Sequence, residues 1–474
     1  MKLLLFTHYY LPEYGAPQRR WASLIAEFRR AGHEVTVVAP PPHYPSGTVP
    51  PHLRAGTHVH STREGRYGEQ VVRCAYLPHR SDIYSRTADH AVAAFDSALL
   101  ALWMFGIRRR TARPDVVVAT APGIPSLLAG LVTARLLGVP FVAEMRDAWP
   151  DLVTHVSAEP VRLPRAASAA RVEALGRPTG AGPDRRNRAT LELSFPSAQD
   201  GPPPERLIGR GYGLAGTSRT VRGRRAVTVR IKRLVHRQIS ALQKRADAVV
   251  TTTVGFADIL QDRGVKQVRV LRNMPRTGPR MDLPEPPLEA PALRVLYFGN
   301  IGRSQGLDAV VRGAAIAKAR GALLDVRFVG HGFDHSRLER LAAELDAPVT
   351  VLSRVPQEQA SAHYVWADTV LVSLQNWAPF EWTIPSKTYE LLATGRHITA
   401  VVAGETARII EEAGAGDVVP PGDAQAIADH FESLAAHRDR LRRESRGAEW
   451  LAEHANIETI AADYLELLGS VVRR

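Results

Sequence analysis

The chain has 474 residues, of which 45% are hydrophobic, and a formal net charge of +13 at pH 7. This length exceeds one ordinary hydrophobic core, so we expect two domains. A single cysteine, Cys74, excludes an internal disulfide and a CxxC metal site and favours a reducing compartment. The N-terminus lacks the pattern of a signal peptide, and no run of about twenty apolar residues is apparent, so we expect no transmembrane span.

The first elements predict a β-loop-α-β unit. KLLLFTHYY is a short apolar run typical of a buried parallel strand, and the loop LPEYGAPQ with Gly15 follows it. The apolar residues of RRWASLIAEFRRAGHEV recur three and four apart, which predicts an amphipathic helix that ends at Gly32. VTVVAP is the next expected strand.

The alternation of strands and helices continues through most of the chain. We expect strands at 115–122 and 140–147 around a helix at 126–138. After a proline-rich linker, further strands are expected at 293–302, 324–332, 349–355 and 368–374, with helices at 307–320, 336–345 and 357–366, and the last segment is helical. This order predicts an α/β protein with parallel sheets covered on both faces, and an active site between two such domains, beyond the carboxyl ends of their strands.

Composition sets the expected domain boundaries. They are an N-terminal Rossmann-like domain at 1–156 and 226–274, a basic Pro/Gly/Arg-rich insertion at 157–225, a linker at 275–292, a second domain at 293–450, and a C-terminal helix at 451–474. The segment from His155 to Arg237 holds 17 Lys plus Arg against 6 Asp plus Glu, so its excess of 11 accounts for most of the net charge. It reads as a disordered insertion, a corrupted reading frame, or a basic arm that binds anionic headgroups. Its aromatic residues are too sparse to favour nucleic acid.

A second basic stretch, ALLALWMFGIRRR at 98–110, joins an apolar helix to three arginines. This pattern fits a helix that lies in a membrane interface with its arginines at the headgroups. It also fits a helix buried against the sheet, and the sequence leaves both readings open.

Glycine-rich loops are candidates for phosphate binding. FGNIGRSQGLD places Gly302 and Arg303 between a strand and a helix, where backbone N–H groups and a guanidinium fork can meet a phosphate. The same stretch fits a tight turn with a solvated arginine.

PSKTYELLATG, at 385–395, opens a helix with a hydroxyl and a cation. The free N–H groups of its first turn can accept a phosphate, with Ser386 as donor and Lys387 as counter-charge. Glu390 follows Ser386 by four residues, hence on about the same face, where a carboxylate can accept the two hydroxyls of a ribose. A helix capped by Ser386 with solvated charges is the competing interpretation.

The strand end EMRDAWP carries Arg146 and Asp147. They form either a structural ion pair or a polar pair at the expected cleft.

In combination, five stretches resemble the loops of GT-B glycosyltransferases of family four, nearest their WbuB-like branch: HYYLPEYGAPQRR, RDAWPDL, YFGNIGRSQGLD, FVGHG and IPSKTYELLATG. The resemblance covers about 1–155 and 236–474. It implies a GT-B fold, with two Rossmann-like domains facing each other across a cleft. It also implies sugar transfer from a nucleotide-diphospho co-substrate to an acceptor, usually with retention and without a bound metal or cofactor.

The resemblance assigns roles to individual residues. It implies catalytic roles for Arg146, Asp147, Arg303 and Lys387. It implies that the nucleotide sugar is bound by Gly15, Gly302, Arg303, Gly330, Gly332, Ser386, Lys387 and Glu390.

Four positions depart from the family pattern. Gln305 stands where a second phosphate-binding cation is common, and Trp382, beside Glu381, stands where the family has its first glutamate. Arg146 replaces the frequent N-domain histidine, and Asn273-Met274 replaces the usual Asn-Gly. These departures leave the catalytic polar groups open.

We therefore expect a retaining, metal-independent glycosyltransferase of hexosyl or N-acetylhexosaminyl type, with a UDP-linked donor. Its acceptor is expected to be a lipid-linked or surface-polysaccharide intermediate of the cell envelope, at the cytoplasmic face of the membrane, with peripheral contact to anionic lipid. Two alternatives remain at this point: a nucleotide-sugar epimerase on the same scaffold, and a degenerate, non-catalytic assembly partner.

Overall fold

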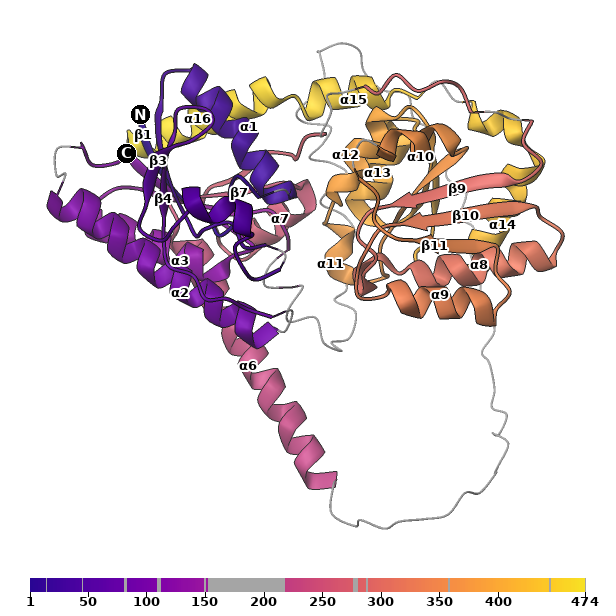
Figure 1. Cartoon of the computed structure of the whole chain (residues 1–474), viewed down its shortest axis with the longest axis horizontal. Coiled ribbons are helices and arrows are strands. Elements are labelled where there is room, and N and C mark those ends of the chain that lie inside the picture. Colours follow the sequence, from indigo (N-terminus) through magenta and orange to yellow (C-terminus); the bar gives the residue numbers. More distant parts are fainter. Residues whose placement is uncertain are drawn as a thin grey trace, which may run out of the picture. The chain divides into compact units, whose positions relative to one another are not determined.

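The computed structural model describes residues 1–13, 15–44, 46–80, 83–108, 112–148, 151, 218–275, 280–286, 289–356, 359–442 and 445–473, with 218–231 described by backbone alone (Figure 1). The chain divides into a larger unit, Met1–His155 with Lys232–Arg474, and a smaller unit, Val156–Ile231. The larger unit holds two sheets and every predicted site residue.

The first sheet has eight strands in the order β3-β4-β2-β1-β5-β6-β7-β8. All neighbours pair in parallel except β3 with β4, which are antiparallel. Its strands are β1 (Lys2–Phe6), β2 (Glu34–Ala39), β3 (Thr62–Glu64), β4 (Gln70–Arg73), β5 (Val116–Thr120), β6 (Phe141–Met145), β7 (Ala248–Thr251) and β8 (Val268–Val270).

Helices cover both faces of this sheet, because successive strand residues point to opposite sides. Leu3 and Leu5 of β1 share a core with α1 and α16, whereas Leu4 and Phe6 share the opposite core with α2, α3 and α7. The elements around this sheet are α1 (Ala16–Arg30), η1 (Pro51–Gly56), α2 (Ile83–Ala101), η2 (Leu102–Arg108), α3 (Ile124–Leu137), α6 (Ser218–Arg245), α7 (Val254–Asp262) and α16 (Ile457–Val472).

The second sheet has six parallel strands in the order β11-β10-β9-β12-β13-β14. They are β9 (Leu293–Phe298), β10 (Leu324–Val329), β11 (Val349–Leu352), β12 (Thr369–Ser373), β13 (His397–Val401) and β14 (Gly416–Val419). Two buried clusters, one built on Val295 and one on Leu296, cover its two faces.

The helices of the second domain alternate with these strands in the chain or follow the last of them, as in a doubly wound fold (Figure 1). They are η5 (Arg303–Gln305), α8 (Leu307–Ala319), α9 (His335–Glu344), α10 (Ala360–Trp366), α11 (Ala378–Glu381), α12 (Ser386–Ala393), α13 (Gly404–Glu412), α14 (Ala424–Ala436), η7 (Arg438–Leu441) and α15 (Gly447–His454).

The predicted α/β class and the two parallel-sheet domains are confirmed, while several element bounds differ. The expected single C-terminal helix is two helices, because the Asn456 side chain accepts the N–H of Thr459 and starts α16 anew. Helix α6 begins at Ser218, inside the segment predicted as an insertion. The rest of that segment, 157–217, lies outside the described residues.

The expectation that no apolar run is long enough to span a membrane is wrong for the helix Tyr84–Arg108. By length and composition alone it passes that test. The sequence reading missed it because Asp89, His90 and Asp96 interrupt the apolar pattern. In the structure α2 packs on α3, and η2 buries Met104 and Phe105 in the core.

Candidate active site

Two loops beyond the carboxyl ends of β9 and β10 pack backbone against backbone. Gly299 donates its N–H to the Val329 carbonyl at 2.9 Å. A Cβ added to Gly330 would lie 1.7 Å from the Gly299 carbonyl oxygen, and one added to Gly332 would lie 2.1 Å from that of Ile301. Gly330 and Gly332, which were both predicted to line the pocket, therefore have to be glycines, because a side chain at either position would prevent the loop after β9 from packing against the loop after β10.

Lys387, in the first turn of α12, points its ammonium at this loop. Its Nζ lies 3.6 Å from the centroid of the Tyr297 ring, and a Cβ on Gly299 (φ +149°) would lie 2.5 Å from the same nitrogen. The nitrogen is shielded from solvent and has no hydrogen-bond partner among the described residues. Burial lowers the pKa of Lys387 to about 7, although the charge of Glu390 opposes this shift. The cation–π contact does not replace a counter-anion.

The other two residues predicted on α12 differ in their surroundings. Ser386 is the first helical residue and is exposed, so it is not the cap; Pro385 precedes the helix and no side chain caps it. Glu390 is half-buried and accepts a hydrogen bond from the Tyr364 hydroxyl at 3.2 Å. The helix thus presents uncapped N–H groups beside a buried cation, with a carboxylate one turn further along.

Arg303 lies on the same loop as Gly299 but is mostly exposed, at 70% of its side chain. Its Nε lies 3.8 Å from Asp334 Oδ1, and its guanidinium carbon lies 4.9 Å from the Phe333 ring centroid. Gly302 donates its N–H to Gln305 Oε1 at 3.0 Å. Gln305, which replaces a cation of the family pattern, therefore stabilises the turn that carries Arg303.

The N-terminal candidates are held by their own domain. Arg146 donates to the Ala121 carbonyl at 2.9 Å and 3.2 Å, and its Nε lies 3.8 Å from Glu144 Oε1. Asp147 is half-buried, and the structure shows no hydrogen bond or ion pair between it and Arg146 among the described contacts. Gly15 directly precedes α1, where a Cβ would lie 2.3 Å from Gln18 Oε1.

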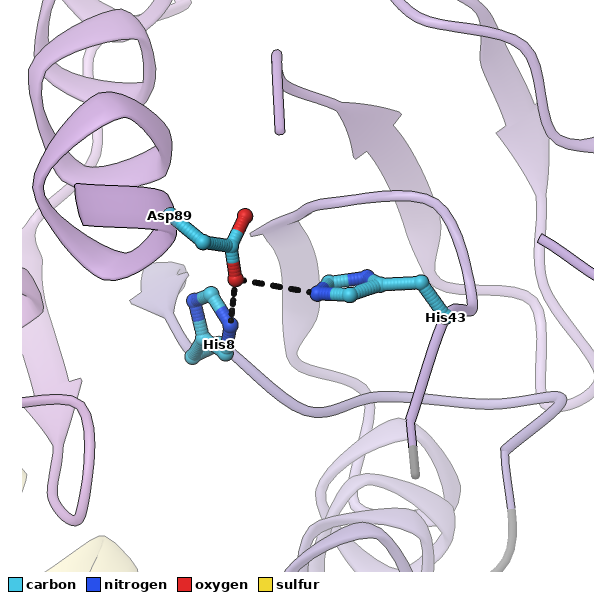
Figure 2. A group of neighbouring side chains, drawn as sticks. All are labelled: His8, His43 and Asp89. Carbon is cyan, nitrogen blue, oxygen red and sulfur yellow. Dashed lines mark hydrogen bonds and ion pairs between the residues drawn. The ribbon is translucent and has the colours of Figure 1, made fainter. Parts of the chain in front are cut away.

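A buried histidine cluster in the first domain was missed at the sequence level. His8 and His43 each approach Asp89 Oδ2 at 3.0 Å (Figure 2). The available signal was one histidine shortly after each of the strands β1, β2 and β4, the last being His79. Those strands are neighbours in the sheet, and this neighbour relation cannot be read from the sequence.

Two family models match the chain in the order of its two domains. One, described as "Glycosyl transferase 4-like domain", matches residues 15–185, and the other, "Glycosyl transferases group 1", matches residues 292–437. The first match covers strands β2 to β6 of the first sheet, and the second covers all six strands of the second sheet.

Curated relatives match a shorter stretch. The chain is 30% identical over 141 residues to a probable glycosyltransferase, WbjE, of Pseudomonas aeruginosa, a match that covers 29% of the chain and 34% of the relative. It is 26% identical over 139 residues to the amylovoran biosynthesis glycosyltransferase AmsK of Erwinia amylovora, again covering 29% and 34%. The chain thus matches about a third of the length of these relatives.

Solved structures share the fold across the whole chain. Sucrose-phosphate synthase from Thermosynechococcus elongatus superposes with a TM-score of 0.59 at 14% identity, covering 99% of this chain and 98% of that one. Anabaena HepE, solved with UDP-glucose, gives 0.58 at 13% identity, covering 99% and 100%. On these matches and this shared architecture, the chain has the two-domain GT-B fold, and each of its two domains matches a glycosyltransferase family model.

Proposed function

We propose that the protein transfers a hexosyl or N-acetylhexosaminyl group from a UDP-linked donor to a lipid-linked or surface-polysaccharide acceptor. The observation that carries the proposal is the buried, unpartnered ammonium of Lys387 beside the first turn of α12. Such a group destabilises the fold unless an anion joins it, which argues against a degenerate scaffold and for a diphosphate site. The HepE structures with UDP and UDP-glucose, and the names of the two curated relatives, support this choice.

In this proposal the chain supplies mainly electrostatic stabilisation. Lys387 and the uncapped N–H groups of α12 meet the diphosphate, and the exposed Arg303 swings onto it as the donor binds. Glu390 accepts the ribose hydroxyls, while Arg146 and Asp147 face the reacting sugar and Gly15 the acceptor side. We further propose retention, a transfer step without a metal ion, and membership in the WbuB-like branch.

Donor binding tests the proposal through its pH dependence. The diphosphate favours the charged form of Lys387, so it raises the lowered pKa of that group when it binds. Affinity for UDP-glucose should be highest below pH 7 and should fall by about tenfold or more between pH 6.5 and pH 8.5. The donor diphosphate keeps its charge over this range, because both of its phosphates are esterified.

The matched variant is Lys387→Arg, which stays charged throughout and should show a flat pH profile. The readout is the dissociation constant from calorimetry at four pH values. A wild-type profile as flat as that of the variant, or no binding by any sugar nucleotide in a panel, would contradict the proposal.

Glu390→Ala tests the ribose contact. Loss of a carboxylate that accepts two hydroxyls should weaken UDP binding by about 1.5–3 kcal/mol. Glu344→Ala, at the exposed end of α9, is the control and should leave the affinity unchanged. Unchanged affinity in a folded Glu390→Ala protein would refute the ribose assignment.

We also propose that the protein lies on the inner face of the cell membrane. Two helices that pack together each expose a row of apolar side chains four residues apart. These rows are Phe95, Leu99, Trp103 and Ile107 on α2–η2, and Leu128, Val132 and Leu136 on α3. Arg108, beside Trp103, ends the longer row with a cation, as expected for a surface at anionic headgroups.

Vesicle binding checks this surface. Replacing both Phe95 (69% exposed) and Ile107 (73% exposed) by serine should reduce partition into phosphatidylglycerol vesicles by at least about tenfold, because each side chain loses apolar burial in the interface. Leu323→Ser, an equally exposed apolar residue of the second domain, is the control. Equal partition of the double variant and the control would rule out this face.

A further inference from the structure

Three histidines of the first domain follow three neighbouring parallel strands. His8 lies just after β1, His43 after β2 and His79 after β4, and these strands are adjacent in the order β4-β2-β1. Asp89, on α2, contacts the imidazoles of His8 and His43 (Figure 2), and its Oδ2 lies 4.0 Å from Nε2 of His79. All four side chains are buried, with at most 5% exposed. The cluster therefore forms at the carboxyl edge of the first sheet, apart from the donor residues of the second.

The distances among His8, His43 and Asp89 fit a common central ion, and His79 lies farther out. Asp89 Oδ2 lies 3.0 Å from Nε2 of His8, 3.0 Å from Nε2 of His43 and 4.0 Å from Nε2 of His79. In a tetrahedral zinc site two donor atoms lie about 3.3 Å apart, because each is about 2 Å from the metal. The His43 ring centroid is 5.4 Å from that of His8 and 5.5 Å from that of His79, close to the roughly 5 Å that such geometry gives for imidazoles bound through Nε2.

The hydrogen bonds leave the correct nitrogens available. His43 donates Nδ1–H to the Pro41 carbonyl at 2.7 Å, and His79 donates Nδ1–H to the Arg80 carbonyl at 2.8 Å. In the neutral tautomer each ring then turns an Nε2 lone pair toward Asp89, as metal-bound histidines do. Neither ring nitrogen of His8 makes a hydrogen bond of normal geometry, although the residue is 97% buried. A cation among these atoms would bind the Nε2 lone pairs and the Asp89 oxygen.

A second His–Asp–His group in the same chain shows the contrast. Asp417 Oδ2 lies 3.2 Å from His397 Nε2 and 3.9 Å from His430 Nδ1, but Arg440 also donates to that oxygen at 2.5 Å. In that group Arg440 supplies the positive charge that neutralises Asp417. Among the described contacts no lysine or arginine pairs with Asp89, so the first-domain group lacks that neutralising partner.

We propose that His8, His43 and Asp89 bind one divalent transition-metal ion of the zinc class, with His79 beside them. Two imidazoles and a carboxylate form a ligand set that Zn²⁺ accepts in tetrahedral geometry, with a fourth position left for water or another donor. The ion fastens the loops after β1, β2 and β4 to α2, and so fixes the start of the segment that leads to Gly15. It takes no part in the chemistry at the diphosphate.

Metal analysis and spectroscopy of the full-length, tag-free protein test this site. Purified protein should contain one zinc per chain, lose it to a chelator with a lower Tm, and regain its Tm with Zn²⁺. Added Co²⁺ should give the intense visible absorption of a tetrahedral site with one ion per chain. Asp89→Asn and His43→Gln should each weaken Co²⁺ binding by at least about a hundredfold.

His397→Gln, which removes a ligand-like histidine from the arginine-neutralised group, is the matched control and should retain the metal. UDP-glucose binding should persist in the chelated protein, because the donor residues lie in the other domain. The proposal is wrong if the protein binds neither Zn²⁺ nor Co²⁺ in a one-to-one ratio, or if its Tm does not change when a chelator is added. It is also wrong if the Asp89→Asn variant binds the metal as tightly as the wild type. A Tm that changes with pH but never with metal identifies the cluster as a histidine–aspartate ion pair only.

Discussion

Replacing Lys387 by methionine should remove turnover while making the ligand-free protein more stable. The ammonium lies against Gly299 and Tyr297 without a hydrogen-bonded anion among the described residues, so the charged form is disfavoured in the empty protein. An unbranched apolar side chain of similar length fills the same space without that penalty. We expect the turnover number to fall by about 10²–10³-fold, as for loss of one preorganised group at a developing charge. We expect a gain of about 1–2 kcal/mol in the free energy of unfolding.

The stability gain should itself depend on pH. Folding lowers the pKa of Lys387 from 10.5 to about 7, so the folded state releases a proton that the unfolded chain keeps. The penalty of burying the charge is complete below pH 7 and disappears as pH rises toward 10.5. The difference in Tm between Lys387→Met and wild type should therefore be large at pH 6.5 and small at pH 9.

Two controls bracket this prediction. Lys318→Met, at a half-exposed lysine paired with Asp346, should change neither turnover nor the pH dependence of Tm. Arg303→Ala combined with Lys387→Met should lose less activity than the sum of the single variants, because both groups act on one diphosphate. A Lys387→Met protein with wild-type turnover would remove the diphosphate site from the proposal.

Gly330→Ala should collapse the loop arrangement on which the donor site depends. The added methyl would lie 1.7 Å from the Gly299 carbonyl oxygen, a backbone atom that cannot rotate away. The loop after β9 must then move off the loop after β10, which withdraws Gly299 from Lys387. We expect a loss of at least about 3 kcal/mol in stability, at the upper end for overpacking, and loss of measurable UDP-glucose binding.

Gly469→Ala provides the matched comparison. It lies inside α16, and an added Cβ would meet nothing closer than 3.7 Å, so alanine should be neutral or stabilising there. Chemical denaturation of both variants gives the free energy of unfolding, and calorimetry gives the affinity for UDP-glucose. A Gly330→Ala protein with normal stability and normal donor affinity would show that the tight loop contact is not needed.

The sequence by itself determined the fold class and predicted the candidate residues of the second domain. Apolar runs of strand length alternate with helical periodicity, and that pattern depends only on which side chains leave water. The stretch 385–395 also carries its own signal, because a helix start, a cation and an acid four residues beyond a hydroxyl lie within one continuous element. The helical repeat alone decides on which face of the helix these residues lie, whatever the rest of the chain does.

Only the tertiary structure decided the environment of those residues. That Lys387 is buried, and therefore titrates near neutrality, follows from Gly299 and Tyr297, which lie about ninety positions earlier in the chain. Arg303, with a similar sequence signal, turned out mostly exposed. Desolvation depends on neighbours brought by the order of strands, so no local pattern reports it.

The histidine cluster shows the same limit most clearly. His8, His43, His79 and Asp89 are spread over about eighty residues and carry no spacing that marks a metal site. They meet because β4, β2 and β1 are neighbours in the sheet and because parallel strands bring their carboxyl ends to one edge. Residue identity was visible in the sequence, but the order of strands is a long-range property of the packed core, and that order determined which residues share a site.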